Sequence, residues 1–316
     1  MALCLKASIV SFIALSMAAP VAYAAEGSNV ALVLGVKGSP FYQALQCGAQ
    51  DEAKKLGLNL TVSAPDQFAA DSQIPVVNAV AATKPAVAAI VPTDAQALVA
   101  PMKQLADMGA KVITIDQTIN DTSFVQTEVL TDNHQGGVLA ADAMNKLLGG
   151  KGSVIVITQP PGSAAQDART TGFEEQLKKY TGITYLGAQY QSDDPQKAAE
   201  IVTSTLSAHP DLAGIFATND QGAIGAVTGL RQASAAGKIK VVAYDAATAE
   251  VAAFKNGTIH ALIAQDPKLE GEVAMQKAAD LIAGKTMDKT TLTKIVTITA
   301  GNAADADTYE YKANCM

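Results

Sequence analysis

The chain has 316 residues and a formal net charge of −7, and its basic residues form no cluster. This balance argues against nucleic acid and against an anionic membrane surface as partners. Tryptophan is absent and aromatic residues make up 5% of the chain, so few large side chains are available for a broad apolar protein interface. We therefore expect a monomer.

Residues 1–24 have the pattern of a secretory signal peptide. Lys6 precedes an apolar core at 7–18, and Ala22 and Ala24 are the small residues that a signal peptidase reads. The core is shorter than the ~20 residues of a membrane-spanning helix; a hydrophobic helix at the start of the chain is the alternative. Removing this segment takes away Lys6 and no acid, so the net charge changes from −7 to −8. The sequence predicts export to the periplasm, with enough chain left for two domains.

Apolar runs and helix-like stretches alternate along the rest of the chain. Such alternation predicts parallel sheets with helical crossovers. The expected strands lie at 30–36, 58–63, 86–91, 111–115, 153–158, 183–190, 212–217, 239–244, 259–264 and 294–299. The expected helices lie at 40–56, 71–83, 95–108, 135–148, 164–179, 195–207, 221–236, 247–255 and 268–283.

The pattern has a break near 120–133, and its ten or so strands are too many for one comfortable sheet. Two similar halves of alternating strands and helices explain it better. A single (β/α)₈ barrel is the alternative, and it fits less well because the pattern has more than eight strands.

The apolar runs end in short polar clusters. Buried parallel strands read as unbroken apolar runs, and open α/β sheets bind ligands beyond the carboxyl ends of their strands. The sequence therefore predicts a receptor for a small molecule. The clusters include 37–42, 92–94, Asp116-Gln117, 158–162, Asn219-Asp220, Asp245 and Gln265.

The sequence motifs of P-loop enzymes, serine hydrolases and zinc proteases are missing, and the three histidines are scattered. We expect no catalytic residue, no metal site and no cofactor. A polyhydroxylated ligand explains the polar clusters, because carboxylates accept from hydroxyls, amides do both and Arg donates. Phe41 and Tyr42 either cover the apolar face of a sugar or pack a helix N-terminus against the core.

Cys47 and Cys315 remain after the leader, with Cys4, is removed. Their spacing is not that of a metal site, and an oxidising compartment favours pairing. Two unrelated cysteines are the alternative. We expect a disulfide that fastens the C-terminal tail to the first half of the protein.

With these clusters in this order, the chain resembles the periplasmic sugar-binding proteins of ABC importers, of the ribose-binding type. The resemblance covers about residues 29–299. It rests on eight short motifs: Ser39 to Tyr42, Pro92 to Ala95, Ile113 to Asp116, Thr131 to Asn133, Ala168 to Phe173 around Arg169, Phe216 to Asp220, Ala243 to Asp245, and Ile263 to Gln265.

The resemblance implies two Rossmann-like α/β lobes with parallel sheets, joined by three hinge crossovers. The N-terminal lobe would comprise 25–131 and 266–293, and the C-terminal lobe 132–265 and 294–299, followed by a tail at 300–316. The crossovers would fall near 131–132, near 265–266 and near residue 293. A membrane permease would receive the ligand.

The resemblance also implies a set of ligand-binding residues in the cleft between the lobes. Phe41 and Tyr42 would supply an aromatic face. Acceptors and donors for hydroxyl groups would be Asp116, Asn219, Asp245, Arg169 and Gln265.

Three positions depart from the family's ribose binders. Gln117 stands where they have Arg, Ser39 where they have Asn, and Asp193 where the second lobe supplies an aromatic ring. Tyr190 lies close enough in sequence to substitute for that ring. A site with less stacking and more hydroxyl recognition suits a linear polyol, or a sugar held differently.

The sequence leaves three alternative functions. A binding protein of this type can also serve a sensor or chemoreceptor. An exported carbohydrate-processing enzyme would need catalytic residues that the sequence does not supply. A transcription-factor effector domain shares the fold, but the signal peptide and the missing helix-turn-helix segment disfavour it.

Overall fold

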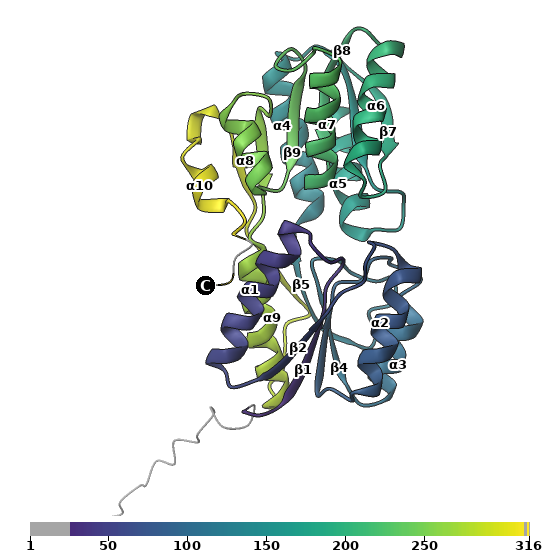
Figure 1. The fold of residues 1–316 in the computed structure, drawn as a ribbon, viewed down its shortest axis with the longest axis vertical. Coiled ribbons are helices and arrows are strands. Elements are labelled where there is room, and N and C mark those ends of the chain that lie inside the picture. Colours follow the sequence, from purple (N-terminus) through teal and green to yellow (C-terminus); the bar gives the residue numbers. More distant parts are fainter. Residues whose placement is uncertain (1–25, 313–314, 316) are drawn as a thin grey trace, which may run out of the picture.

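A computed structural model describes residues 26–312 and Cys315 of the protein (Figure 1). The signal peptide expected at 1–24 lies outside the described residues. Two α/β lobes are stacked along the long axis of the molecule, and each has helices on both faces of its sheet (Figure 1). Over residues 26–312, no helix combines the length and apolar character needed to cross a membrane.

The first lobe contains a six-stranded parallel sheet with the strand order β11-β5-β4-β3-β1-β2. Helices α1 and α9 pack together on one side of the sheet, and α2 and α3 on the other (Figure 1). The strands are β1 (Asn29–Val33), β2 (Asn59–Ser63), β3 (Val87–Ile90), β4 (Lys111–Ile115), β5 (Val125–Thr131) and β11 (Thr290–Thr293). The helices are α1 (Pro40–Lys55), α2 (Ala70–Ala82), α3 (Val99–Asp107) and α9 (Pro267–Ile282).

The second lobe repeats this arrangement with the order β12-β10-β9-β8-β6-β7. All pairs are parallel except β12, which runs antiparallel to β10. The strands are β6 (Gly152–Thr158), β7 (Ile183–Tyr190), β8 (Leu212–Ala217), β9 (Lys240–Tyr244), β10 (Ala261–Ala264) and β12 (Val296–Ile298). The helices are α4 (Asn133–Leu148), α5 (Ala164–Leu177), α6 (Pro195–Ala208), α7 (Asp220–Gln232), α8 (Thr248–Lys255) and, in the tail, η1 (Ala300–Asn302) and α10 (Asp305–Tyr309).

The central strands are mostly apolar because helices cover both faces of each sheet. Every residue of β3 and of β10 is buried. Several helices begin at a proline, which has no backbone N–H to leave unbonded at a helix start. Asp194 and Asp266 cap α6 and α9 by accepting from backbone N–H groups of the first turn.

The prediction of two parallel α/β lobes is confirmed, and the (β/α)₈ barrel is wrong because the strands form two separate sheets. The expected break near 120–133 is also wrong, since it contains β5. This strand reads Val-Gln-Thr-Glu-Val-Leu-Thr. Its polar residues interrupt the apolar run by which the other strands are recognised. These residues have hydrogen-bond partners outside the strand: Glu128 accepts from Thr118, and Thr127 donates to the backbone oxygen of Asp288.

The chain passes between the two sheets three times: after β5, after β10, and between β11 and β12. Both sheets have the strand order 2-1-3-4-5 in their first five strands. This order reverses direction beside the first strand, and the crevice at that point is where open sheets of this type bind ligands. The carboxyl ends of β1, β3 and β4 therefore face those of β6, β8 and β9 across the boundary between the lobes.

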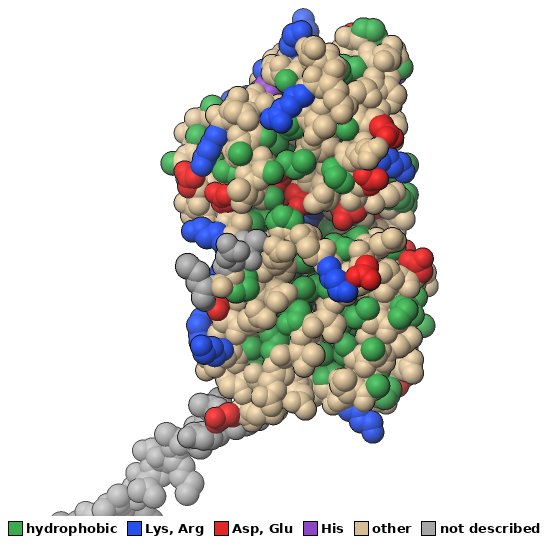
Figure 2. Space-filling view, in the orientation of Figure 1, with side chains coloured by type: hydrophobic (Ala, Val, Ile, Leu, Met, Phe, Trp, Pro, Cys, Tyr) green, Lys and Arg blue, Asp and Glu red, His purple; other side chains and the backbone are tan. Residues whose placement is uncertain are grey.

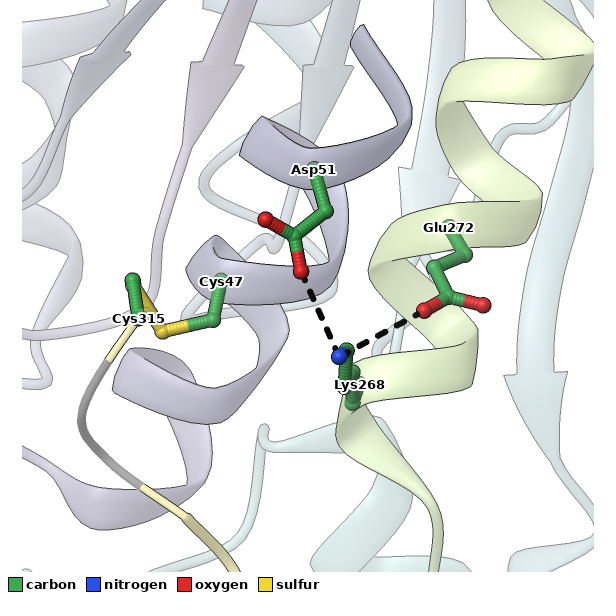
Figure 3. The surroundings of a disulfide bond; sticks show 5 residues. All are labelled: Cys47, Asp51, Lys268, Glu272 and Cys315. Carbon is green, nitrogen blue, oxygen red and sulfur yellow. Dashed lines mark ion pairs between the residues drawn. A yellow bond between two sulfur atoms is a disulfide. The ribbon is translucent and has the colours of Figure 1, made fainter. Parts of the chain in front are cut away.

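Cys47 of α1 and Cys315 form a disulfide with a Cα–Cα distance of 4.9 Å, which confirms the expected pairing. Beside it, Lys268 at the start of α9 forms ion pairs with Asp51 of α1 (3.3 Å) and Glu272 (3.9 Å) (Figure 3). The disulfide and the α1–α9 contact thus lie on the same part of the first lobe.

Helices α1 and α9 approach each other closely through glycines. A Cβ atom on Gly48 would lie 1.9 Å from the backbone oxygen of Lys268, and one on Gly271 would lie 2.1 Å from that of Leu45. Since both obstacles are backbone atoms, neither can move without shifting a helix. The first lobe depends on glycine at these two positions.

We predict that Gly48→Ala destabilises the protein by about 2 kcal/mol, because overpacking against backbone outweighs the gain in helix propensity. Urea denaturation measures the difference. Gly301→Ala is the control, since the nearest atom to its new Cβ lies 3.7 Å away. Equal stability of the two variants would contradict the packing argument.

Candidate functional site

A cavity lies between the lobes, at the carboxyl ends of the strands of both sheets. Figure 2 shows the boundary between the lobes across the middle of the molecule, with acidic side chains on both sides of it. The free space between the lining side chains is about 30 Å³, which is room for about two water molecules. The lining residues are Ser39, Phe41, Tyr42, Phe68, Asp116, Gln117, Gln159, Gln166, Arg169, Asp193, Asn219, Asp220, Asp245 and Gln265.

Nine of the ten residues named from the sequence line this cavity. Tyr190 does not line it, so the expectation that its ring replaces the second lobe's aromatic residue is wrong. It ends β7, an edge strand of the second sheet, and its side chain is 44% exposed. Asp193, three residues later, forms that part of the wall instead.

Five lining residues were not named as ligand-binding residues from the sequence: Phe68, Gln159, Gln166, Asp193 and Asp220. Gln159 and Asp220 stand in polar clusters that follow strands, so the same signal that found their neighbours could have found them. Phe68 and Asp193 lie in loops. Asp193 has a φ of +59°, and nothing in the local sequence shows where that turn points its carboxylate.

Asp116 and Asp245 follow the central strands β4 and β9 directly. Both have a left-handed backbone, with φ of +60° and +93°, which turns the chain sharply at the strand end. Tyr42 donates its hydroxyl to Asp116 (3.0 Å). Asp245 accepts from Gln265 Nε2 (2.6 Å), from the Tyr311 hydroxyl (2.9 Å) and from the Asp220 backbone N–H (3.2 Å).

Arg169 is the cation of the cavity. It comes from α5 and is 2% exposed. Its Nε donates to Asn133 Oδ1 (2.8 Å), its Nη1 donates to the backbone oxygen of Thr218 (2.8 Å), and the guanidinium lies 3.7 Å from the centre of the Tyr244 ring. These contacts fix the plane of the guanidinium, so its remaining N–H groups are held in place for a ligand.

A second polar group closes the other wall. Asn219 caps α7 by accepting from Gly222 N–H (3.0 Å), and it donates Nδ2 to Asp193 (2.9 Å). Gln159 also donates to Asp193 (3.2 Å). Asp193 is thereby held by two amides of the second lobe, where the ribose binders place an aromatic ring.

The aromatic rings of the site come from the first lobe. Tyr42 and Phe68 stack with their planes 9° apart and their centres 6.3 Å apart, and Phe41 meets Tyr42 edge to face. Phe41 and Tyr42 are both buried and belong to the apolar core. Both rings therefore pack α1 against the core and also line the cavity.

Four carboxylates and one guanidinium line the cavity, so its side chains carry an excess of negative charge. Burial raises the pKa of Asp116 to about 6, against the attraction of Arg169. Burial and the charge of Asp245 raise the pKa of Asp220 to about 8. Among the described residues, no group of three or more metal-type side chains is suited to hold an ion.

Gln265 donates its amide to Asp245, but among the described residues its buried Oε1 has no donor. A buried acceptor without a donor costs free energy, and this one belongs to a residue that lines the cavity. A hydroxyl group placed there would satisfy it.

Contacts also cross the mouth of the cavity. Gln117 of the first lobe accepts from the Ala165 N–H of α5 (2.8 Å), and Ala95 N–H donates to the backbone oxygen of Gly162 (2.9 Å). The lobes therefore touch through these contacts as well as at the three crossovers.

The raised carboxyl pKa values predict that the protein without ligand loses stability as the pH rises from about 4 to about 8. Asp116, with a pKa of about 6, and Asp220 and Glu270, with pKa values of about 8, stay protonated in the folded protein while the unfolded chain ionises near its ordinary values. The folded state then binds more protons than the unfolded state, so rising pH favours unfolding.

Thermal melting between pH 4.5 and 8.5 measures this dependence. Asp220→Asn should flatten it, because that carboxyl no longer titrates, whereas the exposed Asp107→Asn should leave it unchanged. Melting temperatures that rise with pH across this range would contradict the argument.

Comparison with known proteins agrees with this geometry. Residues 30–286 match the family model described as a periplasmic binding protein domain. A ribose import binding protein of Salmonella typhimurium is 32% identical over 280 residues, which are 88% of this chain and 93% of the relative.

Two solved structures are similar throughout. A solute-binding protein of an ABC transporter from Agrobacterium vitis, bound with α-D-tagatopyranose, is 33% identical with a TM-score of 0.88, over 90% of this chain and 99% of the other. A carbohydrate transporter solute-binding protein from Agrobacterium radiobacter, in complex with D-arabinose, is 27% identical with a TM-score of 0.85, over 92% and 98% of the two chains.

Proposed function

This chain belongs to the periplasmic binding protein family, and we propose that it captures a sugar or polyol between its lobes and delivers it to an ABC importer. The main observation behind this proposal is the lining of the cavity, where carboxylates, amides and one guanidinium from the two lobes surround one small space. The site acts by binding alone. The protein works in the periplasm, as a monomer, with a membrane permease as its partner.

A polyhydroxylated molecule could form hydrogen bonds with every kind of polar group in this lining. Asp116 and Asp245 accept from hydroxyl groups, Arg169 donates to ring or hydroxyl oxygens, and Gln265 offers its unpaired Oε1. Phe41 and Tyr42 cover an apolar face. Micromolar affinity corresponds to about 8 kcal/mol, which several charge-assisted hydrogen bonds supply after the costs of association.

The excess of carboxylates selects uncharged ligands over acidic ones. Compared with ribose binders of the family, the site has Gln117 in place of a cation and Asp193 in place of a ring. A sugar acid or a sugar phosphate would add negative charge beside buried carboxylates, and such repulsion is strong where water is excluded.

A thermal-shift screen of the mature protein tests the ligand class. D-tagatose, D-arabinose, D-ribose and four- to six-carbon polyols form the first set, and D-glucuronate and D-ribose 5-phosphate form the second. We expect at least one member of the first set, and none of the second, to raise the melting temperature. If only anions or amino acids stabilise the protein, the proposed function is wrong.

Substitution of one carboxylate tests the site. Asp116→Ala should weaken binding of the ligand found in that screen by about 2 kcal/mol, because ligand hydroxyls then face a buried surface without their charged acceptor. Calorimetric titration measures the affinity. Asp107→Ala, on the exposed side of α3, is the matched control and should bind as the unmodified protein does.

We further propose that the lobes open and close. The parts that move would be 25–131 with 266–293, and 132–265 with 294–299. The cavity is lined from both lobes, and the contacts of Gln117 and Ala95 bridge the lobes beside it, so entry of a ligand would require these contacts to part. A ligand that touches both lobes binds the closed form better, and this difference in affinity drives closure.

Small-angle X-ray scattering checks the motion. The radius of gyration should fall when the ligand is added to saturation, because the population shifts towards the closed form. The same sugar added to the Asp116→Ala variant at the same concentration serves as the control. An identical scattering profile with and without bound ligand would exclude the opening motion.

A further inference from the structure

The tail after β12 lies on the second lobe. Helix α10 sits beside α8 (Figure 1), and Asp307 of α10 forms an ion pair with Lys255 of α8. Further along, the Tyr311 N–H donates to the backbone oxygen of Ala246 (3.0 Å). The expected docking of the tail on a lobe surface thus takes place on the second lobe, where α10 finds its ion-pair partner on α8.

The disulfide nevertheless joins the tail to the first lobe. Cys315 is bonded to Cys47 in α1 (Figure 3), and only three residues separate it from Tyr311. A groove between α1, the β10–α9 crossover and the tail is lined by Ala44, 265–268 and 308–312. The tail thus spans from one lobe to the other beside one of the three places where the chain crosses.

Tyr311 touches both lobes at once. Its side chain is 4% exposed. The hydroxyl donates to Asp245 Oδ1 of the second lobe (2.9 Å), and the ring meets the edge of Phe41 of the first lobe with a centre-to-centre distance of 5.7 Å. Both neighbours line the ligand cavity, whereas Tyr311 does not.

We propose that the C-terminal tail is a strap between the lobes, in which Tyr311 positions Asp245 for the ligand and the Cys47–Cys315 disulfide holds Tyr311 in place. This inference deepens the proposed function and rests on it where it concerns the ligand. The strap is a fourth connection between the lobes, and it is covalent at its first-lobe end.

The length of the strap limits the opening. Four Cα–Cα steps lead from Tyr311 to Cys315, so the two residues can separate by at most ~14 Å. Because the strap lies beside the β10–α9 crossover, that side of the molecule moves least when the lobes part. The strap therefore restricts the amplitude and direction of opening without preventing it.

The bond also raises the local concentration of Tyr311 at Asp245. A chain terminus without a tie frays, and Tyr311 then competes with water for the carboxylate. With Cys315 bonded to α1, docking of Tyr311 is an intramolecular step over three linking residues. Asp245 also accepts from Gln265. Without Tyr311, the Asp245 carboxylate would therefore keep one side-chain hydrogen bond but would be held less firmly in position.

Hydrogen exchange of the protein without ligand tests the strap. In a Cys47→Ala, Cys315→Ala double variant, the Tyr311 amide, which donates to Ala246, should exchange about tenfold faster or more than in the disulfide-bonded protein, because the tail then frays. Amides of β3 are the internal control, and they should be unchanged if the fold is intact. Equal exchange at Tyr311 in both proteins would overturn the proposal.

Binding tests the positioning role. With D-tagatose as the probe, or the best ligand of the screen, Tyr311→Phe and the double variant should each raise Kd about five- to tenfold. Tyr309→Phe removes the hydroxyl of the tail's other tyrosine, which is not a donor to Asp245, and should leave Kd unchanged. Equal Kd for Tyr311→Phe and Tyr309→Phe would overturn the role. If no sugar binds the unmodified protein, the proposed function fails, and the exchange experiment still decides the strap.

Discussion

The buried charge of Arg169 is the constraint on which the rest of the site depends. Its guanidinium is 2% exposed, and the free-energy cost of removing this charge from water is offset only by well-placed hydrogen-bond and charged partners. Burial alone would lower the pKa of Arg169, but Tyr244, Asp245 and Asp116 outweigh it and raise the pKa above its ordinary value. The carboxylates at the strand ends thus stabilise the charged form of Arg169. In return, the positive charge of Arg169 reduces the repulsion among these carboxylates.

This pairing reaches across the two lobes. Arg169 comes from α5 of the second lobe, whereas Asp116 ends β4 of the first. Their opposite charges attract, and this attraction favours the contact between the two lobes around the cavity. An uncharged ligand rich in hydroxyl groups, as we propose, would donate to the carboxylates and accept from the guanidinium without adding charge to the site.

The strand-end residues were predictable because two features of the local sequence coincide there: an apolar run and a polar residue directly after it. An apolar run followed by Asp116 or Asp245 fixes both the strand and the side of the sheet at which it ends. Asp193 and Phe68 depend on loop conformations that no periodicity describes. Strand β5 was missed because its polar residues interrupt the apolar pattern and its outer neighbour β11 comes about 160 positions later in the chain. Its polar side chains find partners in both places: Glu128 accepts from the nearby Thr118, and Thr127 donates to the distant backbone oxygen of Asp288.

The disulfide shows where sequence reasoning reaches its limit. The pairing of Cys47 with Cys315 follows from the number of cysteines and the compartment, but the path of the tail does not. That path is set by α10, a five-residue helix whose place depends on the Lys255–Asp307 pair and on burial of Ala306 against the second lobe.

Because α10 lies on one lobe and Cys315 is bonded to the other, a bond that would otherwise only anchor a terminus also connects the two lobes. On the side of Gln117 and Ala95 the lobes are joined by single hydrogen bonds, which can break and re-form, whereas on the tail side they are joined through a covalent bond. If the lobes open as we propose, this difference favours opening on the side of Gln117 and Ala95.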